Sequence, residues 1–336
     1  MLSIIIPHLK GKKNLNECIQ SINTEINHEI IVIDNNSIDD SIHYIKEQYP
    51  NVKVIHSNIN LGYAGGCNLG AQHAIGDYLF FLNDDTVLEN QSIEILLNTI
   101  QKNKNISSVQ PKILNYYNKN YFDYAGASGG YIDYLGYPFS RGRIFSTIEK
   151  DKNQYDDKRK IFWASGTAFI TKKNIFNQIG GFDALLFAHM EEIDYHWKCH
   201  LNNYELYVEP KAVIYHKGGQ TLQYGSYKKT YLNHRNSMIL FLTNNQKLSF
   251  ITICKRIVLE KLALIYYMST INFKSALAVM MANLWWMINI KYILKRKKII
   301  KNTINLNTKI SNELMVPYSI VKEYFFKKNI YYKNMN

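Results

Sequence analysis

The first third of the chain alternates short apolar runs with segments in which apolar residues recur at helical spacing. The apolar runs lie at 3–6, 29–33, 52–55 and 77–82. The helical faces between them are marked by Leu15, Cys18, Ile19 and Ile22, and then by Ile42 and Ile45. This alternation is typical of βαβ units, and it predicts an α/β fold with a mostly parallel sheet.

The pattern changes along the rest of the chain. Residues 115–160 lose it and are rich in Tyr, Gly and Asp, which indicates an ordered insertion. It returns at 161–171 and continues with a helix, a Gly180-Gly181 turn, an acidic helix and a strand near 212–215. Beyond about Ser226 the pattern is helical to the end. The 336 residues suffice for one large α/β domain with an appendage, or for two modest domains.

Polar residues follow several of the predicted strands. Ligands of open α/β sheets bind beyond the carboxyl ends of the strands, so this edge is the expected site. After the second strand, 34–37 is followed by Asp39 and Asp40. These side chains either cap the next helix, or Asp34 and Asn36 hold the base and ribose of a nucleotide.

A glycine-rich segment spans 60–70. We expect a turn that enters a helix, where backbone amides approach a ligand closely. Tight packing of the turn explains the glycines almost as well. No Gly-Lys-Ser/Thr follows, so the segment is not a Walker loop.

The triplet Asn83-Asp84-Asp85 directly follows the apolar strand at 77–82. Burying two adjacent carboxylates without a counter-ion is costly. Mg²⁺ or Mn²⁺ would remove that cost and complete its coordination shell with substrate phosphates. The alternative is a solvated turn with a helix cap.

A second acidic cluster, Glu191, Glu192 and Asp194, opens a predicted helix. The helix dipole favours negative charge at this end, which is one explanation. Crowded carboxylates also raise one another's pKa, so one of them could act as a general base. His216, after an apolar strand, is either structural or a nitrogen ligand of the same metal ion.

The formal net charge of +13 predicts an anionic partner. Basic residues of the C-terminal third flank apolar tracts, and the uncharged stretch 275–290 holds Trp285 and Trp286. That stretch is shorter than the roughly 20 residues of a spanning helix, so docking on an anionic membrane surface is favoured over crossing. A helical subdomain with a solvated basic face is the alternative. No recognised nucleic-acid motif is present, and we expect no nucleic-acid partner.

The compartment is inferred from the cysteines and the N-terminus. Cys18, Cys67, Cys199 and Cys254 are far apart in the sequence, which is typical of reduced thiols. The N-terminus has no basic leader, and its apolar run is too short for a secretory signal. We therefore expect a cytoplasmic protein, peripheral on the inner face of the cell membrane.

Taken together, these segments resemble glycosyltransferase family 2, in particular its bacterial rhamnosyltransferase-like members, which are inverting enzymes with a GT-A fold. The matching pieces follow the family's order at 3–7, 34–37, 60–68, 83–86, 180–183, 191–194, His216 and 235–236. The resemblance implies a GT-A domain, with its Rossmann-like mixed sheet, over 1–245, including the insertion at 115–160. Residues 246–336 would form a basic helical extension.

Carried over by position, the family's site implies roles for individual residues. The nucleotide would be bound by Pro7, Asp34, Asn36, Gly65, Asn68, Asn83 and Asp84. Asp85 and His216 would hold the metal ion, and Trp163 and Gly166 would face the acceptor. Asn83 departs from the Asp often found first in the family's metal motif, so its role lies between a ribose contact and a water-mediated metal contact. The usual base corresponds to Glu192, with Glu191 as the alternative and Asp194 beside them.

The implied reaction is a single in-line displacement. It would move a sugar from a UDP- or dTDP-sugar to a hydroxyl of a glycan or polyprenyl-linked acceptor, with Mg²⁺ or Mn²⁺ as cofactor. A processive synthase would need several spanning helices and a Gln-x-x-Arg-Trp motif, and neither is found in the sequence. The remaining alternatives are a non-catalytic sugar-nucleotide-binding relative, which Asp85 and Glu192 argue against, and a basic nucleic-acid-binding protein.

Overall fold

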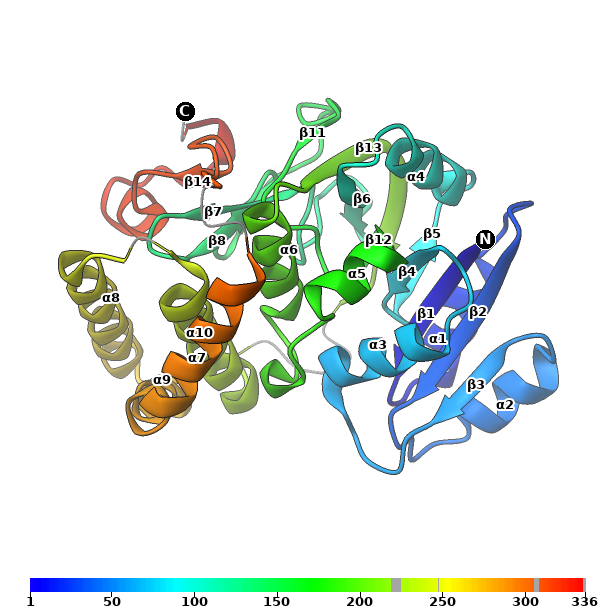
Figure 1. Cartoon of the computed structure of the whole chain (residues 1–336), viewed down its shortest axis with the longest axis horizontal. Coiled ribbons are helices and arrows are strands. Elements are labelled where there is room, and N and C mark those ends of the chain that lie inside the picture. The colour runs from blue at the N-terminus through cyan, green and yellow to red at the C-terminus, as the bar shows by residue number, and fades with distance from the viewer. Residues whose placement is uncertain (219–224, 247, 305–307, 335–336) are drawn as a thin grey trace.

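A mixed β-sheet forms the centre of the protein in the computed structural model, which describes the chain except for 219–224, 247, 305–307 and 335–336 (Figure 1). The strands are β1 Leu2–His8, β2 His28–Asp34, β3 Lys53–His56, β4 Tyr78–Leu82, β5 Thr86–Leu88, β6 Ile106–Asn115, β11 Arg159–Lys160, β12 Ala168–Lys172 and β13 Glu205–His216. Within the described residues the sheet has nine strands in the order β11-β13-β6-β12-β4-β1-β2-β3, with β5 paired to β13. The strands β1 to β4 run parallel, and β12 is antiparallel to β4 and β6.

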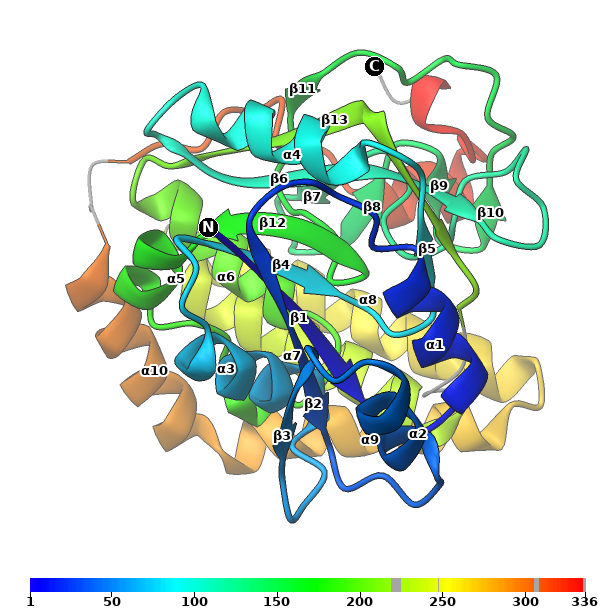
Figure 2. The ribbon, with the colours of Figure 1, turned by 90° about the vertical axis from the view of Figure 1, so that its right-hand side faces the viewer.

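Helices cover both faces of this sheet. They are α1 Lys12–Gln20, α2 Ser41–Gln48, α3 Gly62–His73, α4 Ser92–Gln101, α5 Lys173–Ile179 and α6 Glu191–Leu201. Successive strand residues point to opposite faces, so Ile4 and Ile6 pack in one core with α1, α2 and α4, whereas Ile5 packs in the other with α3, α5 and α6. Helix α4 runs along β6 and β13 (Figure 2). The predicted α/β pattern of the first third is confirmed.

The glycine-rich segment differs from the expected turn. Helix α3 begins at Gly62, so Gly65, Gly66 and Gly70 lie inside it. A Cβ atom on Gly70 would lie 2.4 Å from Cγ2 of Ile5, and one on Gly66 would lie 2.9 Å from Nδ2 of Asn35. These glycines therefore allow α3 to pack closely on β1 and on the end of β2, which is the alternative that the sequence left open.

The segment 115–160 contains much of a second, smaller sheet. Its strands are β7 Gly130–Asp133, β8 Pro138–Ser140, β9 Arg143–Ile144 and β10 Thr147–Ile148, joined by β14 Met315–Val316 near the C-terminus. Strand β14 pairs in parallel with β7. The prediction of helix to the end of the chain is wrong here, because the partner that makes 315–316 a strand lies far away in the sequence.

Four long helices follow the central sheet: α7 Tyr227–Asn244, α8 Phe250–Ser269, α9 Phe273–Ile288 and α10 Ile290–Thr303. They gather at one side of the molecule, opposite β3 and α2 (Figure 1). Helix α7 packs against α6 of the central domain and against α9 and α10. Among the described residues, no single helix is long and apolar enough to cross a bilayer, whereas α9 and α10 reach that length and composition together but are bent by 71°.

Candidate active site

A pocket of about 360 Å³ opens at the edge of the sheet where β1, β2 and β4 end. Residues at the ends of these strands or directly after them form one part of it, namely Pro7, His8, Leu9, Asn35, Asn83, Asp84 and Asp85. The other part comes from the second half of the chain and includes Trp163, Gly166, the run 187–193, His216 and the first turn of α7. The pocket thus lies at the sheet edge where the strand-end pattern predicts a site.

Asp84 is held by a histidine that the sequence analysis did not select. Nδ1 of His8 lies 2.6 Å from Oδ2 of Asp84, and its Nε2 lies 2.7 Å from Oγ of Ser41. Burial raises the pKa of Asp84, although the hydrogen bond and the charge of His8 act in the opposite direction. His8 could have been selected from its position in the sequence, because it directly follows Pro7 at the end of the first predicted strand.

Asp85 and His216 meet in the same pocket, as expected of two residues predicted to share a metal ion. Nε2 of His216 lies 3.1 Å from Oδ1 of Asp85, and its Nδ1 lies 2.8 Å from Oδ1 of Asp123. Burial alone would raise the pKa of Asp85, but the charge of His216 outweighs burial and lowers it. Burial alone would lower the pKa of His216, but the charges of Asp85 and Asp123 outweigh burial and raise it. Nothing in the local sequence around Asp123, inside the insertion, indicated its place beside His216.

This pair fits a divalent cation bound together with a substrate. Within the described part of the chain, no three His, Cys, Asp or Glu side chains gather around one point that could hold a metal ion. A carboxylate on the second ring nitrogen of a histidine, as Asp123 is placed on His216, is the usual support of a metal-binding imidazole. Mg²⁺ and Mn²⁺ accept few protein ligands when substrate phosphates provide the others, so Asp85, and His216 after loss of the proton on Nε2, would be the protein ligands.

Glu191 and Glu192 line the pocket at the first residues of α6. Burial, and then the charge of Glu192, raises the pKa of Glu191 well above its usual value. Burial raises the pKa of Glu192 to about 7, while backbone amides including that of Gly166 act in the opposite direction. The Oε2 atom of each is buried and has no hydrogen-bond partner among the residues that the structure describes. A buried carboxylate that titrates near neutrality, with one oxygen free, is suited to accept a proton.

The predicted acceptor residues Trp163 and Gly166 also line the pocket. The Trp163 indole donates a hydrogen bond of 2.8 Å to the carbonyl of Tyr131, and the Tyr63 hydroxyl donates one to the carbonyl of Gly166. A Cβ atom on Gly166 would lie 3.3 Å from the Tyr63 ring. Tyr63, another pocket residue that the sequence analysis did not select, therefore fixes the Gly166 backbone beside Glu192.

Five predicted residues lie outside the pocket lining: Asp34, Asn36, Gly65, Asn68 and Asp194. Asp34 accepts hydrogen bonds from the Ser37 amide at 2.7 Å and from His56 at 2.8 Å, and it is the neighbouring Asn35 that reaches the pocket. Asn36 adopts a positive φ of 65°. Gly65 lies inside α3, and Asn68 bonds to the backbone of Phe182.

Asp194 has an environment different from that of the two glutamates. Its side chain is buried and is bonded to Arg296, Lys198 and Asn244. Burial alone raises the pKa of Asp194, but Arg296 and Lys198 outweigh it and hold that pKa well below its usual value. A carboxylate so strongly stabilised in its charged form is a poor proton acceptor, which favours a structural role for Asp194 over the predicted catalytic one.

Three cationic side chains also line the pocket, namely Arg143, Lys228 and Lys229. The Arg143 guanidinium lies 3.9 Å from the centre of the Tyr124 ring, and Nζ of Lys229 lies 5.5 Å from the same ring. Burial and then Arg143 lower the pKa of Lys229 to about 8. No motif in the sequence indicated these side chains, although the two lysines stand at the start of the predicted C-terminal helices.

The mixed sheet, with an acidic pocket at its strand ends, defines the class of fold, which is the GT-A fold of solved glycosyltransferases. The profile of Glycosyl transferase family 2 matches residues 3–180, more than half of the chain, and the protein belongs to this family. Both the predicted family and the predicted fold are confirmed.

Individual relatives agree with this classification. The chain is 25% identical over 217 residues, covering 60% of it and 70% of the relative, to the N-acetylglucosaminyl-diphospho-decaprenol L-rhamnosyltransferase of Mycobacterium tuberculosis. Its fold is similar to GalNAc-T7, crystallised with UDP, GalNAc and Mn²⁺, at a TM-score of 0.58 and 18% identity over 72% of this chain and 48% of that one. It is also similar to the mannosyltransferase PcManGT of Pyrobaculum calidifontis, in complex with GDP-Man and Mn²⁺, at a TM-score of 0.51 and 11% identity over 90% of this chain and 82% of that one.

Proposed function

We propose that this glycosyltransferase is a metal-dependent, inverting enzyme of cell-surface polysaccharide synthesis. The donor is a UDP- or dTDP-sugar, and the acceptor is a hydroxyl group of a glycan or of a polyprenyl-linked sugar. The relative from Mycobacterium tuberculosis, an L-rhamnosyltransferase named for a diphospho-decaprenol compound, supports a rhamnose-like donor sugar and a lipid-linked acceptor.

The observation that carries this proposal is the state of Glu192. Its pKa of about 7, its free Oε2 and its place in the same pocket as Asp84 and Asp85 are the properties required of a general base beside a sugar nucleotide. Burial and the charge of Glu192 raise the pKa of Glu191 well above its usual value, and Glu191 stays the alternative base because it lines the same pocket.

The proposed reaction is one displacement at the anomeric carbon. Glu192 takes the proton of the acceptor hydroxyl while the acceptor oxygen bonds to that carbon. The bond between the carbon and the diphosphate oxygen breaks at the same time, so the anomeric configuration inverts. His8 fixes the carboxylate of Asp84, and Tyr63 fixes the Gly166 backbone beside the base.

The metal is expected to be Mg²⁺ or Mn²⁺, held by Asp85 and His216 with Asp123 behind the histidine. When bound, it supplies positive charge that stabilises the leaving diphosphate. The Mn²⁺ in the structures of GalNAc-T7 and PcManGT supports this choice for a protein of the same fold.

The test begins with a thermal-shift screen of UDP-, dTDP- and GDP-sugars with and without Mn²⁺, because a ligand of the folded state raises Tm. The best donor is then used in transfer assays with Glu192→Gln and Glu191→Gln. We expect Glu192→Gln to bind the donor but to transfer about 10²- to 10⁴-fold more slowly, whereas Glu191→Gln stays within about tenfold of wild type. Near-normal transfer by Glu192→Gln with a correct acceptor would show that another group is the base.

We also propose that the protein attaches to the anionic inner face of the cell membrane through α8 to α10. The support is a set of exposed apolar residues on these helices, among them Phe250, Ile251, Ile265, Phe273, Ile288 and Leu294. The same helices carry many lysines and few acidic residues, and each basic residue near an anionic surface adds about 1 kcal/mol.

Vesicle co-sedimentation tests this attachment with the full chain. We expect binding to vesicles that contain phosphatidylglycerol, weaker binding to pure phosphatidylcholine, and a clear loss in the double variant Phe273→Ser/Ile288→Ser. Ile38→Ser is the matched control, because Ile38 is 89% exposed and precedes α2 on the opposite side of the molecule. Equal sedimentation of all variants would refute the proposed attachment of the protein through α8 to α10.

A further inference from the structure

The loop before the base helix is held in an unfavourable conformation. Phe187, His189 and Met190 have positive φ angles of 64°, 68° and 73°. Residues with side chains rarely adopt this left-handed region, so the surrounding structure has to maintain it. The same three residues line the pocket and directly precede Glu191 and Glu192.

Helix α7 holds the middle of this loop. Nδ2 of Asn236, which is fully buried, lies 2.9, 3.1 and 2.7 Å from the carbonyl oxygens of Leu186, Ala188 and His189. Arg235 donates a hydrogen bond of 2.8 Å to the carbonyl of Leu185. Four backbone carbonyls of the loop, those of residues 185, 186, 188 and 189, are therefore bonded to one helix.

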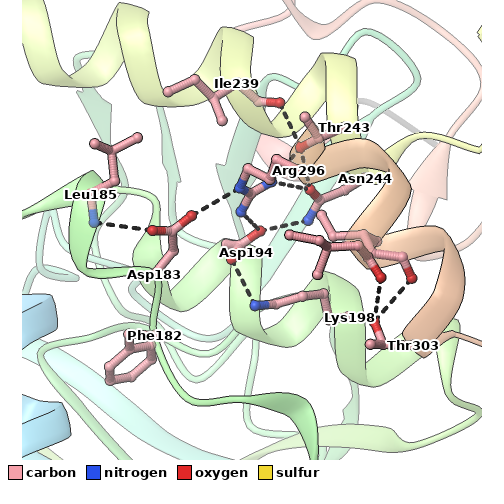
Figure 3. Close-up of polar contacts among 12 residues, drawn as sticks. Phe182, Asp183, Leu185, Asp194, Lys198, Ile239, Thr243, Asn244, Arg296 and Thr303 are labelled. Carbon is pink, nitrogen blue, oxygen red and sulfur yellow. Dashed lines mark hydrogen bonds and ion pairs between the residues drawn. The ribbon is translucent and has the colours of Figure 1, made fainter. Parts of the chain in front are cut away.

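One arginine of α10 holds both ends of the loop (Figure 3). Nε of Arg296 lies 2.9 Å from Oδ2 of Asp183, before the loop, and its Nη2 lies 2.6 Å from Oδ1 of Asp194, in the first turn of α6. Its Nη1 donates to Asn244 at 2.9 Å and to Thr243, both at the end of α7. Arg296 thus joins α10, α7, α6 and the turn after Gly181.

The chemistry of this cluster requires an arginine. Arg296 is only 7% exposed, and together with Lys198 it balances the charges of Asp183 and Asp194. A planar guanidinium can bond to two carboxylates and an amide at once, whereas a lysine ammonium offers a single charged point. Leaving a buried carboxylate without its partner is strongly unfavourable, so loss of Arg296 would displace α6 or the loop.

We propose that Arg296 is a positioning residue for the transfer reaction. Through Asp183 and Asp194 it fixes the two ends of 183–194, and thereby the position of Glu192 relative to the acceptor hydroxyl. The inference rests on the proposed role of Glu192. Helix α10, which is part of the C-terminal extension, is then necessary for activity, although the residues that line the pocket lie in the GT-A fold.

The test compares Arg296→Gln with Arg296→Lys in the full chain. We expect Arg296→Gln to lower kcat by about 100-fold, as misplacement of a catalytic group by about 1 Å does, while KM for the donor changes less than threefold. Arg296→Lys should recover part of the rate, because it keeps the charge but not both bonds. Lys102→Gln, an exposed charge removal far from the pocket, should behave as wild type.

Hydrogen–deuterium exchange separates this inference from the proposed function. In Arg296→Gln we expect faster exchange of the amides of 183–194 than in wild type, with unchanged exchange in β1, β2 and α2, whether or not a transfer assay has been found. Unchanged exchange of 183–194, or an equal loss of kcat and donor affinity, would overturn the positioning role. Inactivity of the wild type with every donor, despite the exchange difference, would instead overturn the proposed function.

Discussion

Asn68 and Phe182 exchange two hydrogen bonds across 114 residues of sequence. Nδ2 of Asn68 donates to the Phe182 carbonyl at 2.8 Å, and the Phe182 amide donates to Oδ1 of Asn68 at 3.0 Å. The side-chain amide of Asn68 therefore bonds both backbone groups of Phe182, as a neighbouring β-strand would. Asn68, which was predicted to bind the nucleotide, thus joins α3 to the turn that follows Gly181.

This pairing predicts that Asn68→Ala destabilises the protein without weakening the nucleotide site. Both backbone groups of Phe182 lose their partners, which costs about 1–3 kcal/mol of unfolding free energy. Urea denaturation measures the loss, and titration with UDP and Mn²⁺ should give an unchanged Kd. Asn118→Ala, at an exposed loop position, is the control. Weaker binding of UDP at unchanged stability would show instead that Asn68 contributes to the nucleotide site.

The pH dependence of transfer should follow the titration of Glu192. Because its pKa is raised to about 7, the carboxyl is protonated below that pH and cannot accept a proton. We expect kcat to rise with pH and to level off above about 7. The profile should persist in Glu191→Gln. A rate that is already at its maximum at pH 5 would contradict the assignment.

Metal binding should depend on Asp85. Mn²⁺ is expected to raise the Tm of the UDP-bound protein, because both ligands favour the folded state. In Asp85→Asn we expect this Mn²⁺-dependent increment to disappear while UDP alone still has its effect. Asp40→Asn removes an exposed carboxylate and should retain the increment. An increment of full size in Asp85→Asn would place the metal ion elsewhere.

The pH dependence of stability should reveal the buried pair of Asp194 and Arg296. The pKa of Asp194 is held well below its usual value, so its contribution is complete above the unfolded pKa of about 3.9 and is lost as the pH falls through the lower folded value. At pH 7, Asp194→Asn should cost about 3–5 kcal/mol of unfolding free energy. The difference from wild type, measured by urea denaturation, should shrink below about pH 4. Asp77→Asn, at an exposed ion pair, should show no such difference.

The pocket could be foreseen only in part. Pro7, Asn83, Asp84, Asp85, Glu191, Glu192, Trp163, Gly166 and His216 line it as the sequence indicated. Asp123 and Arg143 were missed because they lie in the insertion, where no periodic pattern gives a position in the fold. Asp34 and Asn36 were selected in place of Asn35, because a strand-end motif does not tell which of its side chains turns toward the cleft.

The sequence by itself determined the α/β class, the strands of the parallel half and the sheet edge that carries the site. Those properties follow from apolar spacing and from polar residues at strand ends, which are local features of the chain. Only the tertiary structure decided which carboxylate does what. Within the described residues, Oε2 of Glu192 has no hydrogen-bond partner, whereas Asp194, two residues later, meets Arg296 of α10. A pKa depends on burial and on the charges that surround a group, and for Asp194 the charge that lowers the pKa most belongs to Arg296, 102 positions away.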